Sequence, residues 1–193
     1  MNLIKDSRVN ITKANKDGRT VLHYAAELGW YDVIRDVLVR EKSIADKPDA
    51  SKTTPLFLAS AGGREECVYI LLGHGAATNR SYGKGNLPFI AAAVLGGITR
   101  VVHLLHSKPE TNVDAQDPEG MTALHFACDT GNDAMVKMLV EEGKADIHLK
   151  SNSKRSPLSY ASKSGAATVV QFLRSRLELW STKLPFHMLP PES

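Results

Sequence analysis

Two histidines offer the first candidate for chemistry. His103 and His106 stand three residues apart in an apolar stretch, the spacing that places two zinc ligands on one face of a helix. No aspartate, glutamate or cysteine nearby completes a ligand set, and His103 occupies a position that we expect to face the core. We therefore predict a structural or surface role for both histidines and no metal site.

The other candidates are two cysteines and two glycine-rich segments. Cys67 and Cys128 fall at positions that we expect to be buried, whereas a reactive thiol needs an electropositive and partly exposed setting. The glycine-rich segments at 73–77 and 83–85 lack the Gly-Lys-Ser/Thr frame of a phosphate loop. Because the acidic residues form no inward-facing pair either, we predict a protein that is not an enzyme and needs no cofactor.

Composition points to an ordinary globular chain. It has 193 residues, of which 42% are hydrophobic and 23% charged, and its formal net charge is +3. That charge is too small to indicate nucleic acid or a membrane unless it is clustered. No apolar run approaches the roughly 20 residues of a membrane-spanning helix, no secretory leader is visible, and two cysteines suit a reducing compartment. We expect a monomer in the cytoplasm, the nucleus or both.

A repeat of 33 to 35 residues organises the chain. The segment TVLHYAAELG, which starts at Thr20, returns four more times with small changes. The five starting residues, which we call anchors, are Thr20, Thr54, Leu87, Thr122 and Ser156. Nine positions after each anchor stands a glycine: Gly29, Gly63, Gly96, Gly131 and Gly165. Five glycines at one position of a repeat predict a recurring left-handed turn.

Two apolar positions follow each glycine and predict a helix. The first set comprises Ile34, Val68, Val101, Val136 and Val170, and the second comprises Val37, Leu71, Leu104, Leu139 and Leu173. The two sets are three residues apart, which puts them on one helical face. Each unit therefore reads as two short helices joined at the glycine, with the anchor threonine or serine capping the first helix. One unit cannot bury its own apolar face, so the units must stack.

These units resemble the ankyrin repeat. The resemblance is carried in the first unit by Asn15, Gly18, Thr20, Leu22, His23, Ala25 and Ala26, in the second by Thr54, Pro55, Leu56, Gly75, Ala76 and Asn79, and in the fourth by Asp117, Gly120, Thr122, Leu124, His125, Ala127 and Gly143. Lys52 and Lys154 replace the turn glycine, and the third unit departs most. The resemblance implies an all-α solenoid of helix-turn-helix units with protruding β-turn or hairpin loops, in which His23 and His125 hydrogen-bond within the turns.

The expected division has three parts. Residues 1–10 form an N-terminal cap, 11–180 hold five repeats at about 15–48, 49–81, 82–116, 117–150 and 151–180, and 181–193 form a flexible tail.

The resemblance also implies a binding surface, made of the turn tips and the concave face of the first helices. The expected partner-binding residues are Lys16, Asp17, Arg19, Glu27, Leu28, Trp30, Tyr31, Lys84, Asn86, Val94, Leu95, Glu119, Met121, Asp129, Arg155 and Lys163. Trp30 has two interpretations: an exposed anchor for a partner, or a residue packed on the second unit or the cap. Residues 117–147 hold seven acidic and two basic side chains, and 150–183 hold seven basic and one acidic, an asymmetry that could steer a partner.

The expected function is a non-catalytic protein-protein interaction module, such as an adaptor or an assembly chaperone. The alternative is a regulatory or effector ankyrin protein that targets a larger complex. Nucleic-acid binding through the basic C-terminal end is a third and weaker hypothesis.

Overall fold

The computed structural model describes residues 10–79, 94 and 97–183, and the structural statements that follow refer to these residues. The elements are α1 (Val21–Leu28), α2 (Tyr31–Arg40), the short 3-10 helix η2 (Lys42–Ile44), α3 (Pro55–Ala61), α4 (Glu65–Gly73), α6 (Thr99–His106), α7 (Ala123–Asp129), α8 (Asp133–Glu141), α9 (Pro157–Ser164) and α10 (Ala167–Lys183). No strand occurs within these ranges. None of these helices is long and apolar enough to cross a membrane.

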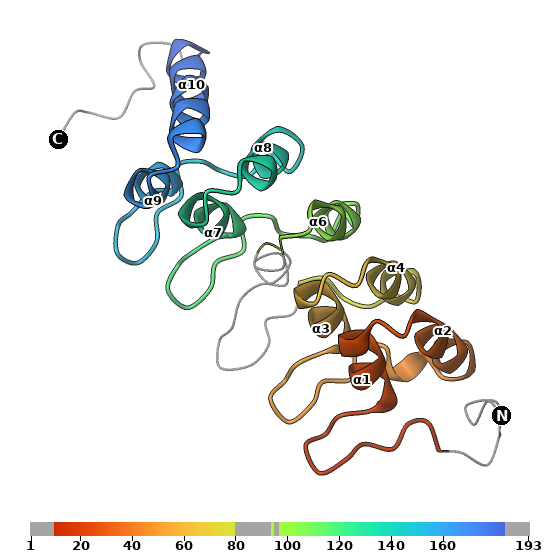
Figure 1. Ribbon diagram of the computed structural model, residues 1–193. Coiled ribbons are helices and arrows are strands. Elements are labelled where there is room, and N and C mark those ends of the chain that lie inside the picture. The colour runs from red at the N-terminus through yellow and green to blue at the C-terminus, as the bar shows by residue number, and fades with distance from the viewer. Residues whose placement is uncertain (1–9, 80–93, 95–96, 184–193) are drawn as a thin grey trace.

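The helices form two parallel rows (Figure 1). One row holds the first helices, in which α1 packs on α3 and α7 packs on α9. The other row holds the second helices, in which α2, α4, α6, α8 and α10 each contact the next. The described turns that precede α1, α3, α7 and α9 project to the same side of the array, at the lower left of Figure 1. The prediction of an all-α solenoid of stacked helix pairs is confirmed.

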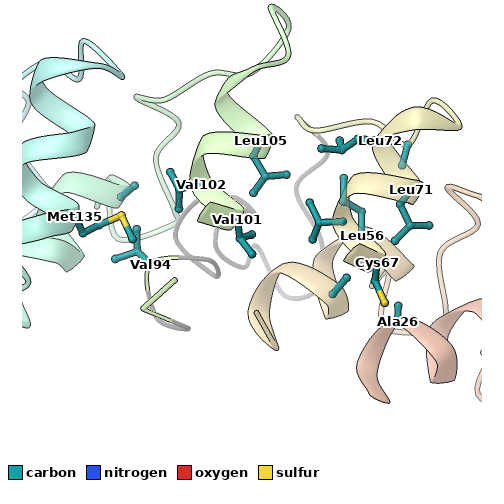
Figure 2. Close-up of a cluster of buried hydrophobic side chains, with 14 of the residues drawn as sticks. Ala26, Leu56, Cys67, Leu71, Leu72, Val94, Val101, Val102, Leu105 and Met135 are labelled. Carbon is teal, nitrogen blue, oxygen red and sulfur yellow. The ribbon is translucent and has the colours of Figure 1, made fainter. Parts of the chain in front are cut away.

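A hydrophobic core runs between the two rows, and Figure 2 shows its central part, from Ala26 on α1 to Met135 on α8. Both predicted apolar positions are buried in three of the units: Ile34 and Val37, Val68 and Leu71, Val136 and Leu139. In the last unit Leu173 is buried but Val170 is only partly buried. Each helix pair therefore covers its apolar face against its neighbours, as a solenoid requires.

The third unit follows a frame displaced by one residue from the predicted one. The described glycine with a left-handed backbone there is Gly97, at φ 69°, one residue after the predicted Gly96, which lies outside the described residues. Counted from Gly97, the two equivalent apolar positions are Val102 and Leu105, and both are buried, as is the predicted Val101. The predicted Leu104 is only partly buried. The two adjacent glycines explain the displacement, because either can adopt the turn conformation.

The other four repeated glycines adopt the predicted conformation. Gly29, Gly63, Gly131 and Gly165 have φ values of 82°, 63°, 65° and 75°. Gly63 shows most clearly why glycine is needed, because a β-carbon there would lie 1.9 Å from Cδ1 of Ile98. Lys52 and Lys154, which stand where the repeat has its other glycine, also adopt positive φ values of 62° and 61°. The turn geometry is therefore kept although the residue differs.

The anchor residues cap the first helices as predicted. The side-chain oxygen of Thr54 accepts a hydrogen bond from the backbone N–H of Phe57 at 3.3 Å, and that of Ser156 accepts one from Ser159 at 3.4 Å. Thr20 and Thr122 make a different cap, which uses a histidine three residues on.

The predicted boundaries fall partly outside what the structure describes. Residues 1–9 of the predicted cap and 184–193 of the predicted tail lie outside it. Helix α10 continues to Lys183, past the expected end of the fifth unit at residue 180. The first helix predicted for the third unit is likewise not described, so the count of five units stays a prediction.

Candidate functional site

Two buried histidines tie each cap to the next turn. In the first unit the backbone N–H of Thr20 donates to Nδ1 of His23 at 3.0 Å, and Nε2 of that ring lies 3.1 Å from the carbonyl oxygen of Thr53, in the following turn. Because Nδ1 accepts, the proton must reside on Nε2 and the neutral ring donates to Thr53. Burial lowers the pKa of His23, which favours this neutral form.

His125 repeats the arrangement one hundred residues later. Its Nδ1 accepts from the N–H of Thr122 at 3.1 Å and its Nε2 lies 3.2 Å from the carbonyl oxygen of Arg155. Its pKa is also lowered, first by burial. The prediction that these histidines hydrogen-bond within the turns is confirmed, and the structure adds that they link consecutive units.

The turn tips are joined to one another directly. The N–H of Ala50 donates to the carbonyl oxygen of Asp17 at 2.9 Å, and the N–H of Asn152 donates to that of Glu119 at 2.9 Å. The tips approach so closely at the second junction that a β-carbon on Gly120 would lie 2.8 Å from the backbone nitrogen of Asn152.

A further set of hydrogen bonds links the loops that follow the second helices. The carboxylate of Asp46 accepts from the N–H of Ala77 at 2.9 and 3.0 Å, and Asp114 accepts from the N–H of Asp146 at 3.0 Å. The turn surface is thus held in place before any partner arrives, which lowers the ordering cost of binding.

Most of the predicted tip residues are available to a partner. Lys16, Asp17, Glu119 and Arg155 are exposed, and Met121 is partly buried. Arg19 is partly buried and engaged: its guanidinium lies 2.7 Å from the carboxylate of Glu27 and 4.6 Å from the centre of the Tyr24 ring.

The first-helix face holds four of the predicted residues and excludes one. Glu27, Leu28, Asp129 and Lys163 are exposed. Val94 is only 3% exposed and belongs to the core, so its predicted place on the surface is wrong. It was assigned from the frame that starts at Leu87, and this unit is the one in which the frame shifts. The predicted contacts Lys84, Asn86 and Leu95 lie outside the described residues.

A patch of large apolar side chains marks the first unit. Leu28 is 52% exposed, Trp30 55% and Tyr31 43%, and Tyr24 stands beside them on α1 at 38%. We call these four residues the aromatic patch. Tyr24 was not predicted, although its spacing of four residues from Leu28 places both on one helical face.

The exposure of Trp30 follows from its place in the repeat. It comes directly after the left-handed glycine, as do Arg64, Ile98 and Ala166 in later units. Each of those three side chains lies over a glycine of the preceding unit, with Arg64 covering Gly29. No described residue offers Trp30 such a place. The first of its two interpretations, an exposed side chain, is confirmed, and its binding role stays a prediction.

Three of the side chains that were candidates for catalysis or metal binding are buried in the core or paired with another side chain. Cys67 and Cys128 are buried as predicted, and burial raises their pKa values to about 11 and about 12, which keeps both as thiols. His103 is exposed, and its Nδ1 lies 3.3 Å from the carboxylate of Glu142, so its predicted core-facing position is wrong. Among the described residues no three histidines, cysteines or acidic residues are grouped to hold a metal ion.

Comparison with known proteins gives one consistent result. The family model described as ankyrin repeats (3 copies) matches residues 1–82 and 89–182. The ankyrin repeat and KH domain-containing protein mask-1 of Caenorhabditis elegans is 37% identical over 123 residues, 62% of this chain and 4% of that protein. Alpha-latrotoxin-Lh1a of Latrodectus hasselti is 32% identical over 121 residues, 61% of this chain and 9% of the toxin. Alpha-latrocrustotoxin-Lt1a of Latrodectus tredecimguttatus is 31% identical over 144 residues, 75% of this chain and 10% of the toxin. The chain thus spans a tenth or less of the length of these relatives.

Proposed function

The chain belongs to the ankyrin repeat family, and we propose that it holds a partner protein on its turn tips and on the exposed face of its first helices, with the aromatic patch as anchor. Ankyrin repeats generally mediate protein-protein interaction, and the family is generally non-catalytic.

One observation carries this proposal. Four large side chains, Tyr24, Leu28, Trp30 and Tyr31, stay exposed within one short segment that also holds the Arg19–Glu27 ion pair. Interfaces concentrate their binding energy in such clusters of tyrosine and tryptophan. The ion pair next to the patch supplies charged groups that can fix the orientation of the partner.

We further propose that the chain acts as a non-catalytic adaptor or assembly chaperone, as a monomer in the cytoplasm or the nucleus. The pre-formed tips support an adaptor, because a rigid surface binds with little loss of conformational entropy. The alternative is regulation within, or targeting to, a larger assembly. A partner that is released when assembly ends would favour the chaperone, and one that stays bound would favour the adaptor or the alternative.

The proposal is tested with an affinity pull-down that compares the natural chain with the double variant Leu28→Ser/Trp30→Ala. Both side chains are about half exposed and need no partner inside the fold, so thermal melts of the two proteins should coincide. We expect the partner recovered with the natural chain to fall at least about tenfold with the double variant, because each interface anchor contributes about 1–2 kcal/mol or more.

Leu179→Ser is the matched control, since Leu179 is another large apolar residue that is about half exposed but lies on the second-helix row, on α10. That variant should recover the same partner at the natural level. Full recovery with Leu28→Ser/Trp30→Ala would show that the aromatic patch does not anchor the partner.

A further inference from the structure

Two strongly exposed apolar side chains lie outside the aromatic patch and the turn tips. Val39 on α2 is 70% exposed and Tyr69 on α4 is 69% exposed. Both belong to the second-helix row, which forms the other side of the array from α1 and α3 (Figure 1).

Neither side chain is required by the repeat. Tyr69 stands six positions after its left-handed glycine, where the other units carry polar residues: Arg35, His103, Lys137 and Gln171. Val39 stands ten positions after its glycine, where the other units carry Gly73, Ser107, Glu141 and Ser175. Stacking therefore does not explain these two apolar residues, and exposed apolar residues that gather in one place mark an interaction site.

The two side chains line one groove of about 570 Å³ that crosses α2, α4 and α6. Leu104 and the partly buried Ile70 add further apolar surface to it. Gly73 and Ser107 line it as well, and their small size leaves space beside Val39. A groove of this volume is of the size that receives a small ligand or one or two side chains of a peptide.

The charged groups around the groove are of one sign. Arg35 and Lys108 line it, and no aspartate or glutamate is among the described residues that do. Arg35 is bound to Asp32 on its own helix, while the ammonium group of Lys108 makes no ion pair within the described part of the chain. A ligand that approaches this groove therefore meets an apolar floor and a basic rim, which is complementary to apolar side chains flanked by carboxylates.

We propose that this groove, defined by Val39, Tyr69, Leu104 and Lys108, is a second docking site that takes a short peptide segment of a partner protein. The segment carries a bulky apolar side chain, which packs between Val39 and Tyr69, and acidic residues on either side of it, which face Lys108 and Arg35. The site is separate from the aromatic patch, so the proposal goes beyond the function proposed above, and one chain can hold two partners on opposite sides.

The test is a selection from a random peptide-display library on the whole chain, with counter-selection on the variant Tyr69→Arg. We expect the enriched peptides to contain a leucine, isoleucine, phenylalanine or tryptophan flanked by aspartate or glutamate. The best peptide is then labelled with fluorescein, and its dissociation constant is measured by anisotropy against the natural chain and against variants.

Four variants separate this groove from other surfaces. Tyr69→Ala and Val39→Ser should each weaken peptide binding about tenfold. Lys108→Glu should also weaken it, and its effect should be several-fold larger at low salt than at high salt. Trp30→Ala should leave peptide binding unchanged. Because all four positions are exposed or partly exposed, each variant should fold, and a thermal melt of each one checks this. A selection that enriches no acidic apolar sequence, or a peptide whose affinity is insensitive to Tyr69→Ala, overturns the proposal. A peptide that is lost with Trp30→Ala overturns it too, and would support the aromatic patch instead.

Discussion

At the scale of single residues, the left-handed glycines decide where each unit bends and how closely the next unit approaches. Gly63 has φ 63°, a conformation that costs a residue with a β-carbon about 1–2 kcal/mol. Ile98 of the next unit also occupies the space where that β-carbon would be. Conformation and packing therefore require glycine at the same position.

We predict that Gly63→Ala lowers the free energy of unfolding by about 2 kcal/mol or more, as Ile98 must also move. Gly73→Ala is the control, because Gly73 ends α4 and a β-carbon there meets nothing within 4 Å. That change should be neutral or stabilise by up to about 1 kcal/mol. Urea denaturation of both variants measures the difference, and equal midpoints would show that Ile98 yields without cost.

Four of the five predicted turn glycines are confirmed, and the fifth, Gly96, lies outside the described residues, next to the left-handed Gly97. Gly96 and Gly97 are adjacent, and spacing alone does not choose between two residues that both tolerate the turn. The shift of one residue explains why Leu104 and His103 were expected to face the core. The predicted Val101 is in the core there, together with Val102 and Leu105, which lie one residue beyond the two predicted positions.

At the scale of elements, the imidazole ring of His23 makes two different hydrogen bonds, and so does that of His125. Nδ1 caps its own first helix, and Nε2 binds the turn of the next unit. The cap of a helix and the stacking of units are therefore coupled through a neutral imidazole. Protonation of Nδ1 would remove the acceptor and break the cap.

This coupling predicts a pH dependence of stability. Both pKa values are lowered from 6.5 in the folded chain, chiefly by burial. Well above pH 6.5 the rings are neutral in the folded and unfolded states, so they add no pH dependence there. Below it the unfolded chain binds protons that the folded chain does not, and the free energy of unfolding falls as the pH falls.

The measurement is the urea midpoint between about pH 8 and pH 5 for the natural chain and for His23→Gln/His125→Gln. The double variant should be less stable at pH 8 and should lose less stability on acidification. The exposed carboxylates are the same in both proteins, so their contribution cancels. Parallel curves would assign the acid sensitivity to other groups.

The residues of the candidate surfaces could be predicted only where a position in the repeat is known to be exposed. Leu28, Trp30 and Tyr31 were expected on the surface and are exposed. The exposure of Tyr69 and Val39 was not predicted. An apolar residue in an apolar helix is expected to be buried unless the positions of the neighbouring helices are known. The groove between them depends on Gly73 and Ser107 in two different units, a juxtaposition that only the stacking reveals.

At the scale of the whole molecule, the described helix pairs pack mainly against their neighbours in the array. Stability in such a stack is close to a sum of unit and interface contributions. Within the described residues, α6 therefore connects the N-terminal helices α1–α4 to the C-terminal helices α7–α10, because it packs on both α4 and α8.

The last prediction uses this one-dimensional order. Val136 on α8 is fully buried, and Val136→Asp would place a charge without a partner in the core, which costs about 3 kcal/mol or more. Because the main packing of α8 within the described residues is on α6, α7 and α10, we expect hydrogen exchange to accelerate in α7–α10 while α1–α4 keep their protection. Exchange followed by mass spectrometry resolves the two groups of helices. The neighbouring exposed Lys137 supplies the control, since Lys137→Asp changes charge without burial and should leave exchange nearly unaltered. Equal acceleration in α1–α4 and α7–α10 would mean that the array unfolds as one cooperative unit, and that the interfaces between units are stronger than the units themselves.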